Sequence, residues 1–262
     1  MPERVSPRRY RARAEYDGTD FAGFQVNPGK RTVQGVLEDA LARLGDGVVQ
    51  RVDGAGRTDA GVHATEQVIA FSYDGRLTTT ELGKALDAQL PADVAIRDVR
   101  AVPDTFNPRF AARYREYRYT VWNGPRSPLR ERTALGVRIP LDTAAMARAG
   151  SVFIGRHDFR AFGATDRSPV RTVSAVRVGR QGRLVTIDVR ADSFLRGQVR
   201  RMVAALLEVG LGREDEAAVR SALAGPGPAF GGISVPAKAL CLRRVAIGRS
   251  GGSGSNGEFE ER

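Results

Sequence analysis

Hydrophobic positions in the first hundred residues switch between a helical period and an alternating one. Apolar residues recur at Val33, Val36, Leu37, Ala40, Leu41 and Leu44 and stop at Gly45, which predicts a helix over 33–44. A second helix is expected over 79–90, ended by Pro91. Strands are expected over 10–16, 48–52, 67–73 and 94–102, and Asp17-Gly18 ends the first of them.

The rest of the chain repeats this rhythm. Strands are expected over 116–122, 170–178, 184–191 and 240–247, with a hairpin turn at Gln181-Gly182, and helices over 143–154, 194–211 and 214–223. Each half then reads strand–helix–strand–strand–helix–strand, the ferredoxin-like order. We therefore predict an α+β fold of two ferredoxin-like halves, whose sheets form an extended mixed or antiparallel sheet with a central cleft.

The same patterns set the expected boundaries of the chain's parts. We expect a flexible N-terminus over 1–8, an N-terminal half over 9–107 and a C-terminal half over 108–248. Residues 249–262 are rich in glycine and serine and end in acidic residues, so they have no apolar surface to bury and are expected to be disordered.

Charge adds a first indication of a partner. Lysine and arginine total 41 against 30 acidic residues, a net charge of +11, and lysine stands only at Lys30, Lys84 and Lys238. A basic surface attracts polyanions, and the guanidinium fork fits phosphate. A bias of the genome toward arginine codons explains the excess equally well, so charge favours a nucleic-acid partner without naming one.

Several classes of protein are disfavoured. No apolar run of about 18 residues is present, and residues 1–13 lack the apolar core of a signal peptide, so we expect no membrane span and a cytoplasmic enzyme. Cys241 is the only cysteine, which excludes a disulfide within the chain and a zinc site built from cysteines.

The segment 53–64 combines three glycines with Arg57, Asp59 and His63 between two predicted strands. Glycine lets backbone approach a ligand closely, and the polar side chains are then held in a tight frame. No long helix follows, which argues against a dinucleotide loop, and no Gly-Lys-Ser/Thr follows, which argues against a phosphate cradle. The alternative is an ordinary turn in which the aspartate caps backbone amides.

Residues 54–63, Gly-Ala-Gly-Arg-Thr-Asp-Ala-Gly-Val-His, closely resemble the catalytic loop of the TruA family of tRNA pseudouridine synthases. The resemblance runs from Tyr10 to Ile247 and includes the stretches 16–19, 21–25, 32–34, 106–110, 115–119, 157–159, 191–195 and 199–200. It implies the pseudouridine synthase fold and isomerisation of uridine at positions 38–40 of the tRNA anticodon stem-loop, without a metal or redox cofactor. Where the family usually has methionine, this chain has Gln198.

The resemblance also implies roles for individual residues. Asp59 is the catalytic carboxylate, Arg200 lies beside it, Tyr117 contacts the target base, and Arg57 fills the space that the flipped base leaves. Without the resemblance, Tyr117 reads as a core strand tyrosine and Arg200 as a solvated helix charge. For His63 we favour a role in fixing the loop.

Contacts to the tRNA backbone are expected from further arginines, above all Arg109, Arg113 and Arg171, with Arg126 and Arg130 as additional candidates. The family also implies a homodimer. Two other functions stay open: a tRNA-binding chaperone on the same scaffold, and another RNA-modifying enzyme such as a methyltransferase. The set of Asp59, Tyr117 and Arg200 favours the synthase, and no glycine-rich loop leading into a helix offers a methyl-donor pocket.

Overall fold

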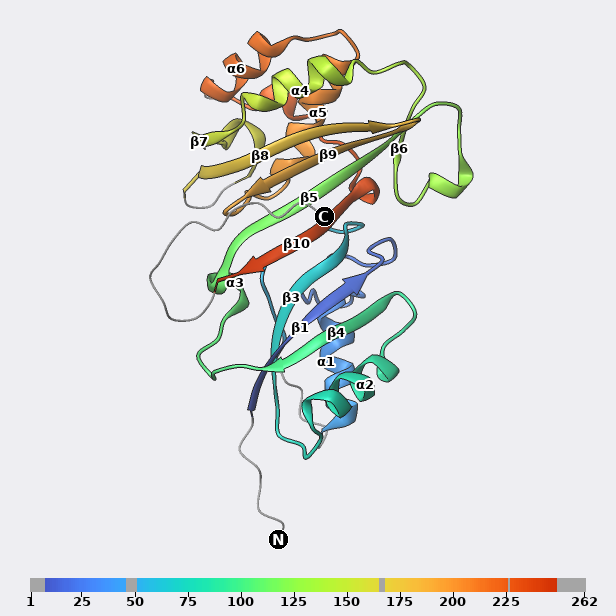
Figure 1. Cartoon of the computed structure of the whole chain (residues 1–262), viewed down its shortest axis with the longest axis vertical. Helices are drawn as coiled ribbons and strands as arrows, with labels where there is room; N and C mark the ends of the chain where they lie inside the picture. The colour runs from blue at the N-terminus through green and yellow to red at the C-terminus, as the bar shows by residue number, and fades with distance from the viewer. Residues whose placement is uncertain (1–7, 46–50, 165–167, 226, 249–262) are drawn as a thin grey trace.

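The computed structural model describes residues 8–45, 51–164, 168–225 and 227–248. In this part of the chain ten strands form one sheet, whose main path is β4-β1-β3-β10-β5-β9-β8-β7 (Figure 1). The sheet is mixed, because β10 pairs parallel with β3 and antiparallel with β5. The α+β class predicted from the sequence is confirmed.

The first half is built from β1 (Arg8–Tyr16), α1 (Val33–Leu44), β2 (Asp53–Gly54), β3 (His63–Tyr73), α2 (Thr79–Gln89) and β4 (Val94–Ala101). Every second residue of β1 from Tyr10 to Tyr16 is buried, so one face of this strand lies in the core. Thr32 caps α1, and Thr78 forms a capping box with Glu81 at α2. These caps explain why both helices begin where the sequence predicts.

The second half contains α3 (Pro108–Ala111), β5 (Ala112–Asn123), β6 (Leu135–Val137), α4 (Thr143–Ser151), β7 (Gly155–Asp158), β8 (Val170–Gln181), β9 (Leu184–Ala191), α5 (Gln198–Gly210), α6 (Glu216–Ala224) and β10 (Leu240–Ile247). Its main strands follow the order β10-β5-β9-β8, and those of the first half follow β4-β1-β3 with β2 beyond β3. Each half thus has the ferredoxin-like strand order.

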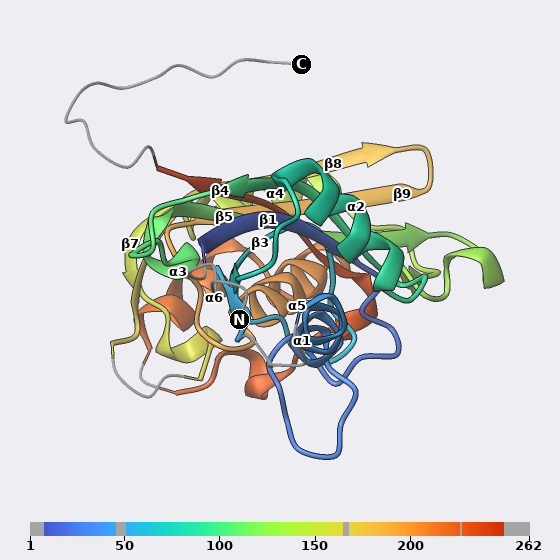
Figure 2. The same cartoon turned by 90° about the horizontal axis from the view of Figure 1, so that it is seen from below.

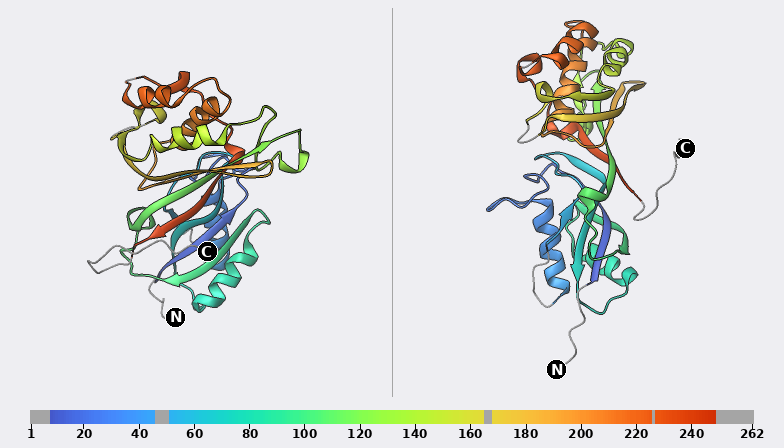
Figure 3. Two further views of the ribbon diagram at one scale, coloured as in Figure 1. Left: turned by 45° about the horizontal axis from the view of Figure 1, so that its top comes forward. Right: turned by 90° about the vertical axis from the view of Figure 1, so that its left-hand side faces the viewer.

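The two halves share one sheet through the last strand. Cys241 and Leu242 of β10 pair with His63 and Ala64 at the beginning of β3, while β2 pairs with β3 further along, at Ile69 and Ala70. Helices α1 and α5 lie on the same face of the sheet (Figures 2 and 3). This junction therefore brings the loop before β3 next to elements of the second half.

Some expected elements differ from the structure. The helix expected over 194–211 begins only at Gln198, because Gly197 adopts a left-handed conformation with φ of 74°. Phe194 and Leu195 precede it in a turn, where Phe194 packs on Tyr117 and Leu195 packs on Gly163. The short elements α3, β6 and β7 were not expected, since three or four residues carry no clear period.

Other expectations fall on parts that the structure does not describe. Most of the strand expected over 48–52 lies outside the described residues, as do residues 1–7 and the tail 249–262. Arg8 is the first residue of β1. Among the described residues, no helix has the length and apolar character needed to cross a membrane.

Candidate active site

The loop between β2 and β3 rests on the segment that follows β1. The amide of Phe24 donates to the carbonyl of Thr58 at 3.1 Å, and that of Gly61 donates to the carbonyl of Phe21 at 3.3 Å. The hydroxyls of Tyr16 and Thr58 are hydrogen-bonded at 2.8 Å in the buried interior. The residues flanking Asp59 are therefore held from several directions.

Two glycines make this packing possible. A Cβ on Gly23, whose φ is 102°, would come within 2.9 Å of the Thr58 carbonyl oxygen. A Cβ on Gly18 would come within 2.0 Å of the Val62 carbonyl oxygen, closer than any contact the backbone tolerates. The stretch 16–25 thus contains glycine where its backbone touches the loop.

Asp59 faces a cation from the other half of the chain. Its Oδ2 lies 3.6 Å from Nη1 of Arg200 on α5, and the two side chains are 38 % and 25 % exposed. Nε of Arg200 donates to the Val235 carbonyl at 2.7 Å, which fixes the guanidinium from its other side. Arg200 is therefore ion-paired and anchored, and the carboxylate still reaches solvent, where a substrate can meet it.

Tyr117 on β5 belongs to the same site. Its ring is buried and packs edge-on against Phe194, with 5.3 Å between ring centroids. Burial raises the pKa of its hydroxyl far above the ordinary value; Arg115 opposes this rise, and the nearby charge of Asp59 adds to it. Tyr117 is consequently neutral at physiological pH.

Arg115 is a functional candidate that the sequence reasoning missed. This buried side chain donates to the Ala55 carbonyl through Nε at 3.2 Å and Nη2 at 2.6 Å, and to the Asp192 carbonyl through Nη1 at 2.6 Å. Nη2 also donates to the Arg109 carbonyl at 2.9 Å. The signal was present in the sequence, because Arg115 is in phase with the apolar positions of its strand, Tyr117, Tyr119 and Val121.

The other predicted arginines are not all gathered at Asp59. Arg57, Arg109 and Arg113 are exposed and form no ion pair with the described residues. Arg171 is half-buried and donates through Nη1 to the carbonyls of Ser168 and Val170, at 2.9 and 2.6 Å. Among the described residues, no hydrogen bond or ion pair joins the Arg171 side chain to the loop of Asp59.

His63 and Gln198 both bind backbone. His63 accepts from the Gly18 amide at 3.1 Å through Nδ1, and its Nε2 lies 2.8 Å from the Lys238 carbonyl, so it links the first half to the segment before β10. The fully buried Gln198 accepts from the Leu195 amide at 2.8 Å. Its amide thus supports the turn before α5, two residues from Arg200.

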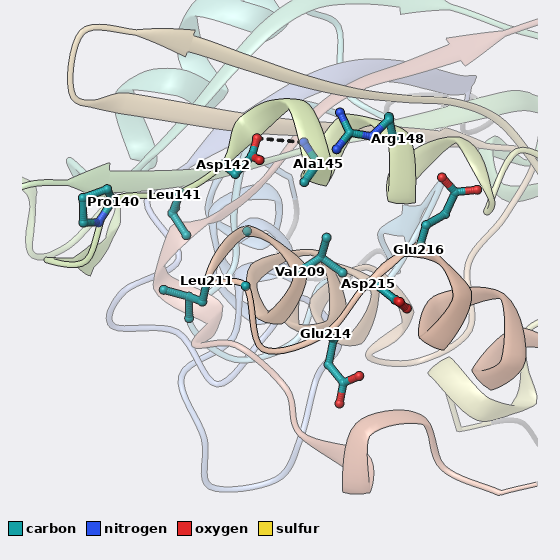
Figure 4. Close-up of a pocket in the computed structure, with 12 residues that line it drawn as sticks. Pro140, Leu141, Asp142, Ala145, Arg148, Val209, Leu211, Glu214, Asp215 and Glu216 are labelled. Carbon is teal, nitrogen blue, oxygen red and sulfur yellow. Dashed lines mark hydrogen bonds between the residues drawn. The ribbon is translucent and has the colours of Figure 1, made fainter.

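A pocket of about 740 Å³ lies elsewhere, between the beginnings of α4 and α6 and the end of α5 (Figure 4). Its lining includes Asp142, Glu214, Asp215 and Glu216, with Arg148 as the basic member. None of the predicted site residues lines it, and its acidic rim is unsuited to a polyanion. In the described part of the chain, no three side chains of histidine, cysteine, aspartate or glutamate gather as metal ligands.

Comparisons with known proteins agree with one another. A family model described as tRNA pseudouridine synthase matches residues 12–111 and 149–246. The tRNA pseudouridine synthase A of Geobacter sulfurreducens is 41 % identical over 235 residues, covering 88 % of this chain and 96 % of the relative. The enzyme of the same name from Thermotoga neapolitana is 42 % identical over 239 residues, covering 86 % and 96 %.

A solved structure of a Cbf5-Nop10-Gar1 complex aligns with 75 % of this chain and 54 % of its own, at 13 % identity and a TM-score of 0.29, which is too weak to support an argument. The family model spans Asp59 and Arg200, whereas Tyr117 lies between its two matched segments. The two relatives cover 88 % and 86 % of the chain. The protein therefore belongs to the tRNA pseudouridine synthase family of isomerases.

Proposed function

We propose that this protein converts uridine to pseudouridine at positions 38–40 of the tRNA anticodon stem-loop. The observation that carries the proposal is the half-exposed Asp59 carboxylate, paired with Arg200 at 3.6 Å and adjoining the neutral, buried Tyr117. The reaction breaks the bond between ribose C1′ and base N1 and forms one between C1′ and C5. The uracil stays bound throughout as both the leaving group and the returning nucleophile. The protein therefore needs one catalytic carboxylate and a pocket that holds the base in place.

In this proposal Asp59 attacks the ribose or the base, or removes the proton at C2′. The transition state carries positive charge at the anomeric carbon, which a carboxylate stabilises as in glycosidases. Arg200 positions this carboxylate, because its own place is fixed by the bond to Val235. Tyr117 packs against the uracil, and its hydroxyl moves a proton at C5 late in the reaction.

Access to the target uridine requires base flipping. A base stacked in the anticodon arm is out of reach of the loop, so it must leave its stack. Arg57 is exposed, lies two residues before Asp59 and has no ion-pair partner among the described residues. Its planar guanidinium is suited to occupy the vacated space.

Recognition of tRNA rests on backbone contacts in this proposal. Arg109, Arg113 and Arg171 bind phosphates, since stems of different tRNAs share shape rather than sequence. We further propose that the protein works as a cytoplasmic homodimer, because one chain offers a small surface for a whole tRNA. Sedimentation as a monomer at micromolar concentration contradicts the dimer.

The decisive experiment measures tritium release from in vitro transcribed tRNA that carries C5-labelled uridine, followed by mapping of the modified position. We expect Asp59→Asn to bind the tRNA and release no tritium, while Asp104→Asn, an exposed aspartate outside the site, behaves as wild type. Tritium release by Asp59→Asn refutes the role of Asp59. A wild-type protein that binds tRNA and releases none is a chaperone, and modification outside 38–40 changes the assigned position.

A further inference from the structure

Phe110 is an aromatic side chain displayed on a basic part of the surface. It is 84 % exposed, and it is the only aromatic among the large exposed hydrophobic residues that the structure describes. A single exposed apolar residue needs no partner by itself. Phe110 becomes a candidate binding residue because of its neighbours. Arg109 and Arg113 flank it, are exposed and form no ion pair within the described chain.

The backbone that carries Phe110 is fixed at both ends. The Asn107 side chain accepts from the Arg109 amide at 2.9 Å, and the Gly248 amide donates to the Ala111 carbonyl at 2.9 Å. Proline at the first position of α3 stiffens it further. Phe110 therefore presents its ring from a preformed base, which lowers the entropy lost on binding.

Arg115 joins this helix to the active-site loop. Nη2 of Arg115 donates both to the Arg109 carbonyl of α3 at 2.9 Å and to the Ala55 carbonyl at 2.6 Å. Arg115 and Tyr117 point to the same face of β5, because they are two residues apart on a strand. A molecule held at Tyr117 and Asp59 can thus extend over α3.

The charge around α3 is positive and poorly compensated. Burial lowers the pKa of Arg115, and the neighbouring charge of Arg109 lowers it further, while Tyr117 and Asp192 oppose the shift without cancelling it. The carboxylate of Asp53, in the strand β2 that contacts α3, is already paired with Arg9 at 2.5 Å. A phosphate group relieves this repulsion, so the surface fits a polyanion that also has flat apolar faces.

We propose that Phe110 stacks on an unpaired nucleobase of the bound RNA, beside the target uridine, while Arg109 and Arg113 bind the flanking phosphates. Every base has a π face, so the contact accepts any sequence, as a substrate range of several tRNAs requires. The proposal rests on the proposed RNA substrate and adds a contact that Asp59, Tyr117 and Arg200 do not supply.

The affinity of the protein for an anticodon stem-loop tests the proposed stacking contact of Phe110. We expect Phe110→Ala and Phe110→Leu to weaken binding by about 5- to 150-fold, and Phe110→Trp to retain it, since stacking needs an aromatic ring. Ile139→Ala, which removes an aliphatic side chain that is 55 % exposed, serves as the control and stays at wild-type affinity. The salt slope stays unchanged in Phe110→Ala and falls by roughly one in Arg113→Ala.

Fluorescence gives a second readout. Trp122 is the only tryptophan, so Phe110→Trp in a Trp122→Phe background carries one probe. We expect the stem-loop to quench this probe, and to leave a probe at Ile139→Trp in the same background unchanged.

Wild-type affinity of Phe110→Ala, or unchanged fluorescence of the Phe110→Trp probe, overturns the proposal. Wild-type affinity of Phe110→Leu, with Phe110→Ala shifting the sedimentation coefficient, assigns the ring to an interface between two copies instead. The proposed function is tested separately from this contact. If Phe110→Ala leaves affinity unchanged while the wild type still releases tritium, the synthase activity is retained and only the stacking role of Phe110 is rejected.

Discussion

Oδ2 of Asp59 lies 3.6 Å from Nη1 of Arg200, although one belongs to the loop before β3 and the other to α5 in the opposite half of the chain. The pairing of β10 with the beginning of β3 sets this distance, because it brings the end of the loop beside the second half. The contact is thus a product of the shared sheet.

The anchoring of Arg200 predicts that a positive charge at this position is not enough to keep the full reaction rate. Lysine at position 200 retains the positive charge but has no second nitrogen to bind the Val235 carbonyl while it faces Asp59. We expect Arg200→Lys to lower the single-turnover rate by about 10- to 100-fold and Arg200→Gln to lower it further. Arg201→Gln on the same helix is the matched control, and equal rates of Arg200→Gln and Arg201→Gln would speak against the role of Arg200.

The hydroxyl of Tyr117 can be separated from its packing. Tyr117→Phe keeps the edge-on contact with Phe194, so we expect little change in the free energy of unfolding. If the hydroxyl transfers a proton at C5, tritium release falls by about 10²- to 10⁴-fold while tRNA affinity persists. Wild-type tritium release by a stably folded Tyr117→Phe would limit Tyr117 to a packing role.

Gly23 tests whether the segment after β1 positions the loop. Alanine there places a Cβ 2.9 Å from the Thr58 carbonyl at a φ of 102°, so the loop must shift. We expect Gly23→Ala to lower stability by about 1–3 kcal/mol, measured by urea denaturation, and to reduce turnover. Gly29→Ala, also at positive φ but with no atom within 4 Å of the new Cβ, should cost less and leave turnover intact.

Buried tyrosines predict a loss of stability at alkaline pH. Burial raises the pKa of Tyr16, Tyr117 and Tyr119 above their ordinary value of about 10. Below pH 10 all three are protonated in the folded and unfolded chain, and their contribution is fully present. Above pH 10 the unfolded chain releases these protons first, so the free energy of unfolding falls as pH rises, by about 1.4 kcal/mol per pH unit for each group.

Urea denaturation between pH 9 and 11 measures this dependence. We expect Tyr117→Phe to reduce the slope of the free energy of unfolding against pH by the contribution of one tyrosine. A slope identical to that of the wild type would mean that Tyr117 already ionises in the folded protein near pH 10.

The sequence indicated the elements and the chemistry of the loop, because both are local. The period of the apolar residues identified α1 from Val33 to Leu44, and strand alternation identified β9 and β10. The glycines of 53–64 indicated close backbone approach before any partner was known. Asp59, Tyr117 and Arg200 were selected through their resemblance to a family.

Tertiary structure decided the features that the hydrophobic period of the sequence does not encode. It set the start of α5 at Gln198, where Gly197 is left-handed and the preceding Phe194 packs on Tyr117 instead of extending the helix. It gave Arg115 two carbonyl partners from distant segments, Ala55 and Asp192, and left Phe110 exposed on the surface. Local propensity determines which residues form a helix or a strand, whereas these contacts join residues far apart in the chain and exist only once the two halves share one sheet.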